Sequence, residues 1–112
     1  MRVLLVDDSE PFRNLLAEVA VAAGFEVAGT AASGEEAVRL FEELRPDVVI
    51  VDVRLPEMSG YEVADRVRAV SAAARVVVVS AADSTCDGRV VPKRFLTPEG
   101  LRSALGISSS SG

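Results

Sequence analysis

The chain has 112 residues, 49% of them apolar and 26% charged, with a formal net charge of −5, so it fits one globular domain with a single core. The negative charge argues against nonspecific binding to nucleic acids or anionic membranes, and one cysteine with no histidine excludes an internal disulfide and a zinc site. No apolar stretch approaches the roughly 18 residues of a membrane span, and the first residues do not resemble a signal peptide, so we expect a cytoplasmic protein.

Segments typical of strands and helices alternate along the chain. Residues 2–6 are apolar on both faces and predict a buried parallel strand. A helix is predicted over residues 10–23, with Ser9 as its N-cap and Gly24 directly after its end. Residues 26–31 predict a weaker strand at an edge of the sheet. The side chains expected to face the core from the first helix are those of Phe12, Leu15, Leu16, Val19 and Ala23.

The second half of the chain continues this alternation. Ser33 and Glu36 have the spacing of a capping box, which marks the start of a helix that ends at Pro46. Strands separated by helices predict an α/β fold, in which right-handed βαβ units form a doubly wound parallel sheet. The remaining elements are strands at 48–52, 75–80 and 89–92, a helix near 61–72 with Val63, Val67 and Val70 inward, and a helix that starts at Thr97-Pro98-Glu99.

Three acidic residues stand at the ends of two predicted strands. Asp7 and Asp8 follow the first strand directly, and Asp52 ends the third. In parallel neighbours these carboxylates would meet at the edge where open α/β sheets bind ligands, and a shared cation would relieve their repulsion. Carboxylate and backbone oxygens are the ligands that Mg²⁺ prefers. Ser80 and Lys93, at the ends of two later strands, add a hydroxyl and an ammonium group, so the set predicts a metal-assisted phosphate site.

Short motifs stand in order at the ends of successive strands: Val6-Asp7-Asp8-Ser9, Asp47-Val48-Val49-Ile50-Val51-Asp52, Leu55-Pro56-Glu57-Met58-Ser59-Gly60, Val79-Ser80-Ala81 and Val91-Pro92-Lys93. Each is common alone, but together they make almost the whole chain resemble the receiver domain of bacterial response regulators. The resemblance implies a flavodoxin-like sheet of five parallel strands in the order 2-1-3-4-5. It also implies a receiver domain at residues 1–107 and a flexible serine-rich end at 108–112.

The resemblance also implies a function. Asp52 would accept a phosphoryl group from a histidine kinase or phosphotransfer protein in an Mg²⁺-dependent reaction, and the domain would signal through protein contacts with an unknown target. Such a domain is not an enzyme in its own right, and it needs neither nucleic acid nor membrane as a partner. By similarity, the ligands of the metal would be Asp7, Asp8, Asp52 and the backbone carbonyl of Arg54, and the contacts to the phosphoryl oxygens would be Ser80 and Lys93. Pro56 and Gly60 are assigned to loop geometry alone.

The chain departs from the family between Ser80 and Lys93, where 12 residues intervene, fewer than is usual. Parallel strands need a crossover of roughly 10–12 residues or more, usually a helix. Residues 81–88 are rich in turn formers and carry no apolar stripe, so we expect the fourth helix to be shortened or replaced by a loop. Val90 stands where receivers usually carry an aromatic residue that reports phosphorylation, and Arg94 replaces the proline that commonly follows the lysine.

These departures leave three functions open. The main hypothesis is a stand-alone phosphoacceptor receiver, and the alternative is a pseudo-receiver that serves as a binding or scaffold module without switching. A Mg²⁺-dependent phosphatase is less favoured, because Arg54 occupies the place of the second acid that its chemistry uses. The lost helix would uncover valines of the fourth and fifth strands, which predicts a homodimer through these strands.

Overall fold

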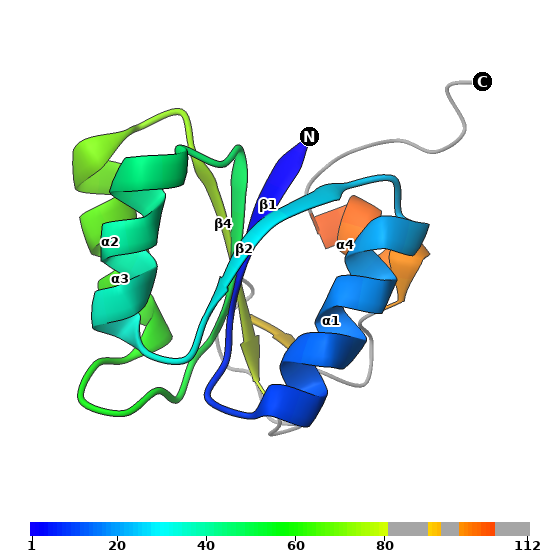
Figure 1. Ribbon diagram of the computed structural model, residues 1–112, viewed down its shortest axis with the longest axis horizontal. Coiled ribbons are helices and arrows are strands. Elements are labelled where there is room, and N and C mark those ends of the chain that lie inside the picture. The colour runs from blue at the N-terminus through cyan, green and yellow to red at the C-terminus, as the bar shows by residue number, and fades with distance from the viewer. Residues whose placement is uncertain (81–89, 93–96, 105–112) are drawn as a thin grey trace.

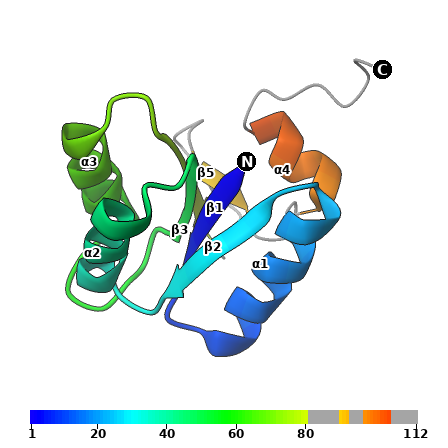
Figure 2. The same cartoon turned by 45° about the horizontal axis from the view of Figure 1, so that its top comes forward.

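Five strands form one parallel sheet in the order β2-β1-β3-β4-β5, between two layers of helices. The computed structural model describes residues 1–80, 90–92 and 97–104. Figures 1 and 2 show α2 and α3 on one face of the sheet and α1 and α4 on the other. The strands are β1 (Arg2–Val6), β2 (Glu26–Ala31), β3 (Val48–Asp52), β4 (Arg75–Ser80) and β5 (Val90–Pro92), and the helices are α1 (Glu10–Ala22), α2 (Gly34–Leu44), α3 (Gly60–Val70) and α4 (Pro98–Ala104).

The predicted fold class and strand order are confirmed. The shortened connection at 81–88 lies outside the described residues, as do Lys93, the Lys93–Arg94 peptide and the serine-rich end at 108–112. Among the helices of the described ranges, none is long and apolar enough to span a membrane.

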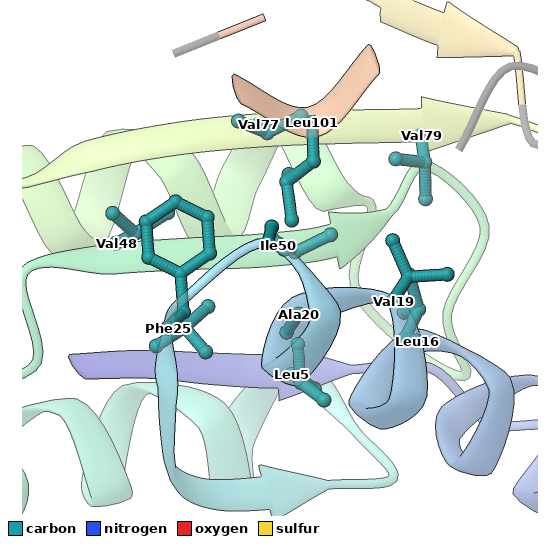
Figure 3. Packing of buried hydrophobic residues seen from close by; sticks show 12 residues of the cluster. Leu5, Leu16, Val19, Ala20, Phe25, Val48, Ile50, Val77, Val79 and Leu101 are labelled. Atoms are coloured by element: carbon teal, nitrogen blue, oxygen red, sulfur yellow. The ribbon is translucent and has the colours of Figure 1, made fainter. Parts of the chain in front are cut away.

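Apolar residues cover both faces of the central strands, because each face packs against its own pair of helices. Leu5, Ile50 and Val77 point toward α1 and α4, where Leu16 and Leu101 meet them in one buried cluster (Figure 3). The alternate residues of the same strands build a second cluster against α2 and α3. This burial on both sides is the expected environment of central parallel strands.

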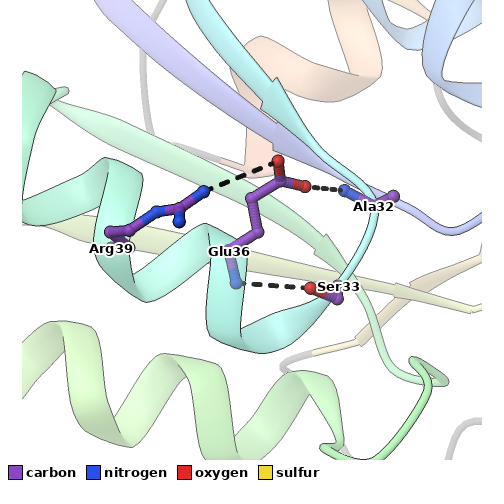
Figure 4. A network of polar contacts seen from close by, with 4 residues as sticks. All are labelled: Ala32, Ser33, Glu36 and Arg39. Atoms are coloured by element: carbon purple, nitrogen blue, oxygen red, sulfur yellow. Dashed lines mark hydrogen bonds and ion pairs between the residues drawn. The ribbon is translucent and has the colours of Figure 1, made fainter.

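Serine side chains cap three of the helices. Ser9 and Ser59 accept hydrogen bonds from the backbone N–H groups of Phe12 and Glu62 at the starts of α1 and α3. At α2, Ser33 accepts from the N–H of Glu36 at 3.3 Å, and the Glu36 carboxylate accepts from the N–H of Ala32 at 2.9 Å rather than from that of Ser33 (Figure 4). The predicted capping box therefore forms with one difference: the carboxylate binds the N–H of the residue before the N-cap.

Two predictions of inward side chains are wrong. Leu15 is 50% exposed, because the buried stripe of α1 runs through Leu16, Val19 and Ala20 and leaves Leu15 at its border. Val70 is the last residue of α3 and is 37% exposed.

The valines of β4 do not form the uncovered patch that the sequence suggested. Val77, Val78 and Val79 are buried, and Val76 is half-buried against the cluster under α2 and α3. The chain itself therefore covers most of β4. A homodimer contact would have to rest largely on β5, whose side chains lie outside the described part of the chain.

The packing of α4 yields a stability prediction. Leu101→Ala should lower the free energy of unfolding by about 2–5 kcal/mol, because it removes a fully buried side chain from the cluster under α1. Leu15→Ala is the control and should lower it by about 1 kcal/mol or less, since that side chain is half-exposed. Urea unfolding measures both, and equal small effects would contradict the docking of α4 on the sheet.

Candidate functional site

The parallel pairing of β1 with β3 brings the predicted acids together. Val6 pairs with Val51, so the chain leaves β1 at Asp7 directly beside Asp52, the last residue of β3. One carboxylate oxygen from each of Asp7, Asp8 and Asp52 lies within 4.8 Å of the others. The three acids named from the sequence therefore form one cluster at the carboxyl edge of the sheet.

Backbone N–H groups fix the two buried carboxylates. Asp7 is 0% and Asp52 is 7% exposed, whereas Asp8 is exposed at the rim. The N–H of Ser9 donates to Oδ1 of Asp7 at 2.8 Å, and the N–H of Arg54 donates to Oδ1 of Asp52 at 3.0 Å. Each bond sets the rotation of its carboxylate.

Arg13 is a part of the site that the sequence did not reveal. From the first half of α1, its Nη1 donates to the backbone carbonyl of Asp7 at 2.6 Å, and its side chain is half-buried there. This charge-assisted bond ties the helix to the point where β1 ends. The distance of six positions from Asp7 fits no short motif, so nothing in the pattern singled it out.

The loop after β3 closes tightly on the end of that strand. Gly60 N–H donates to the carbonyl of Val53 at 2.9 Å, next to an antiparallel bridge between Arg54 and Ser59. A Cβ atom added to Gly60 would lie 2.5 Å from the carbonyl oxygen of Asp52. The role in loop geometry predicted for Gly60 thus has a specific form, because only glycine lets α3 begin against the backbone of Asp52.

Ser80 ends β4 at the same edge of the sheet. Val79 pairs with Asp52 across the β3–β4 ladder, so Ser80 lies one residue beyond the level of Asp52, and it is 8% exposed. Pro92 pairs with Ser80 in turn, which brings β5 to the same edge. Lys93, the next residue, lies outside the described part of the chain.

The donor set fits a hard divalent cation. Three carboxylates within reach of one ion match the oxygen ligands of Mg²⁺, and the exposed Asp8 leaves a side open for the waters that Mg²⁺ usually keeps. The backbone of Arg54 is placed at the cluster by its bond to Asp52. The side chain of Arg54 is exposed, in the position where a phosphatase of this type would need an acid.

Comparisons with known proteins agree with this geometry. The family model of the response regulator receiver domain matches residues 3–91. The chemotaxis protein CheY of Thermotoga maritima is 41% identical over 80 residues, which are 71% of this chain and 67% of that protein. The response regulator domain of Thermotoga maritima CheB has a TM-score of 0.77 at 28% identity, and the match covers 95% of this chain and 94% of that domain.

A longer relative shares only a part of its length. The protein-glutamate methylesterase/protein-glutamine glutaminase 2 of Anaeromyxobacter dehalogenans is 50% identical over 70 residues, which cover 62% of this chain but 20% of that enzyme. Its enzymatic activity is therefore no guide to this chain, whereas the match to CheY extends over most of that protein.

Charge repulsion in the cluster yields a second prediction. Without metal, Asp8→Asn should raise the free energy of unfolding by about 1–2 kcal/mol, because it removes the repulsion from two carboxylates and each pair of unit charges about 4 Å apart is worth about 1 kcal/mol in water. Urea unfolding in EDTA measures the change. Asp65→Asn is the control, because Asp65 is exposed on α3 and does not belong to the cluster. A lower stability of Asp8→Asn than of the unsubstituted protein would contradict repulsion among the acids.

Proposed function

Because the chain belongs to the response regulator receiver domain family, we propose that it is a single-domain response regulator of the CheY type, phosphorylated on Asp52 in an Mg²⁺-dependent reaction. The observation that carries the proposal is the meeting of three carboxylates at the end of β1 and β3. A histidine kinase or a phosphotransfer protein would be the donor. The output would pass through contacts with another protein in the cytoplasm.

In this proposal the metal is held by Asp7, Asp8, Asp52 and the carbonyl of Arg54. When bound, Mg²⁺ would supply positive charge that offsets the negative charge of the phosphoryl oxygens. Water would fill the remaining coordination positions, as it usually does for Mg²⁺, so no further protein oxygen is needed as a ligand.

The chain's own groups would position and neutralise the transferred group. An oxygen of Asp52 attacks phosphorus, the O–P bond forms, and the bond from phosphorus to the donor's imidazole nitrogen breaks, so the imidazole leaves with the electron pair. The Arg54 N–H keeps the carboxylate of Asp52 in a fixed rotation during this step. Ser80 would donate a hydrogen bond to one phosphoryl oxygen, and Lys93 would pair with another.

A homodimer is a weaker part of the proposal. It was expected from valines left uncovered on the fourth and fifth strands, but β4 offers little apolar surface, because Val77, Val78 and Val79 are buried. A stable interface buries roughly 800 Å² on each partner, and the side chains of β5 lie outside the described part of the chain. We therefore expect other proteins, rather than a second copy, to be the main partners.

Labelling by a small phosphodonor tests the function. Acetyl phosphate with Mg²⁺ should give an adduct on the unsubstituted protein, seen by intact-mass spectrometry, that is acid-stable and base-labile. Asp52→Asn or EDTA should abolish it, since each removes a part of the reaction, and Lys93→Ala should leave Mg²⁺ binding intact. An undiminished adduct on Asp52→Asn would contradict the assigned acceptor. No adduct on the unsubstituted protein would favour the non-switching pseudo-receiver.

A further inference from the structure

We propose that Met58 is a positioning residue of the acceptor site, which acts by seating the loop from Arg54 to Ser59 on Gly34 at the start of α2. This inference rests on the proposed Mg²⁺ site, because the loop carries the backbone of Arg54. It assigns a role to a methionine that contacts neither the metal nor the phosphoryl group.

Met58 is the buried side chain of an otherwise open loop. It is 8% exposed, whereas the neighbouring Pro56, Glu57 and Ser59 are exposed. Its side chain belongs to the apolar cluster that the sheet shares with α2 and α3. Met58 is therefore the most deeply buried attachment of the loop to the core, and the partly buried Leu55 packs against the same cluster.

A left-handed turn directs Met58 inward. Glu57 has φ 68°, a conformation that residues other than glycine rarely adopt. Directly after it, the N–H of Met58 donates to the carbonyl of Pro56 at 2.8 Å. A residue stays in this unfavourable conformation only where the surrounding structure stabilises it. The burial of Met58 can stabilise the conformation of Glu57.

Gly34 leaves the space that the Met58 side chain occupies. A Cβ atom at this position would lie 2.7 Å from Sδ, 2.9 Å from Cβ and 3.1 Å from Cγ of Met58. Three consecutive atoms of the Met58 side chain therefore lie against Gly34. Gly34 has no positive φ that would demand glycine, and glycine is a poor residue in a helix. The space that Met58 occupies is therefore the structural reason for glycine at the start of α2.

The other end of the loop is fixed at the acceptor. Gly60 starts α3 with its Cα against the backbone of Asp52, where a Cβ atom would come within 2.5 Å of the carbonyl oxygen. Arg54 forms an antiparallel bridge with Ser59, which stands between Met58 and Gly60, and its N–H holds the carboxylate of Asp52. A shift of Met58 should therefore move the backbone that orients the acceptor and offers the Arg54 carbonyl to the metal.

A double-mutant cycle with Gly34→Ala and Met58→Ala tests the inference in the full chain. Mg²⁺ affinity is measured by calorimetry, and exchange of the Arg54 and Gly60 amide hydrogens is measured by NMR without metal. Met58→Leu is the conservative variant, because leucine and methionine have similar volumes. Gly29→Ala is the matched control. Its Cβ would crowd Leu44 Cδ1 at 2.9 Å, in β2 and away from the acids.

Met58→Ala and Gly34→Ala should each weaken Mg²⁺ binding about 10-fold, as the loss of an outer-shell support commonly does, and speed exchange at both amides. The double variant should lose less affinity than the sum of the two single losses, because alanine at 58 removes Sδ and Cγ and leaves only its Cβ, 2.9 Å from the added methyl. Met58→Leu and Gly29→Ala should bind Mg²⁺ like the unsubstituted protein, even where Gly29→Ala lowers stability.

Unchanged exchange and Mg²⁺ affinity in Met58→Ala would overturn the inference, as would additive losses in the double variant. Equal weakening by Gly29→Ala would also overturn it, since the effect would then follow stability alone. If the unsubstituted protein bound no Mg²⁺, the proposed function would fail instead. The amide exchange would still decide whether Met58 holds the loop.

Discussion

Parallel pairing of β1 with β3 is the constraint on which the site depends. Its register sets Val6 beside Val51, so the next residue of one strand and the last of the other must carry their side chains to one edge. Both places hold aspartates that are almost fully buried, with a third acid at the rim. Like charges this close destabilise the fold, and the apolar packing on both faces of these strands offsets that cost.

Connections after the strands convert this edge into an oriented site. The first residues after β1 and β3 supply the N–H groups that hold Asp7 and Asp52. Arg13 reaches back from α1 to the β1 end, and the glycine contacts of Met58 and Gly60 fix the loop after β3. Orientation thus comes from the backbone and from packing, while the acids would supply the chemistry in the proposed function. This division is common where a protein must place charge rather than perform covalent steps of its own.

The sequence predicted those features that depend on local pattern. Apolar runs predicted the strands, and serines and glycines predicted the helix ends. The ends of the strands predicted the acid cluster and the place of Ser80 at the end of β4. It failed where burial depends on how elements dock, as at Leu15 and along β4. It also missed Arg13 and the Met58–Gly34 contact, because residues far apart in the chain meet there through tertiary packing. The predictions for Lys93 and for residues 81–88 concern parts outside the described ranges.

Dependence of the free energy of unfolding on Mg²⁺ concentration tests the central claim that the edge acids form a cation site. A ligand that binds only the folded chain stabilises it by RT ln(1 + [L]/Kd). Urea unfolding at increasing Mg²⁺, at constant ionic strength, should therefore show stability rising with the logarithm of Mg²⁺ above Kd, by about 1.4 kcal/mol per tenfold. Asp8→Asn should rise later and less. A flat curve for the unsubstituted protein, or the same rise in a variant with Asp7, Asp8 and Asp52 all replaced by Asn, would contradict the account.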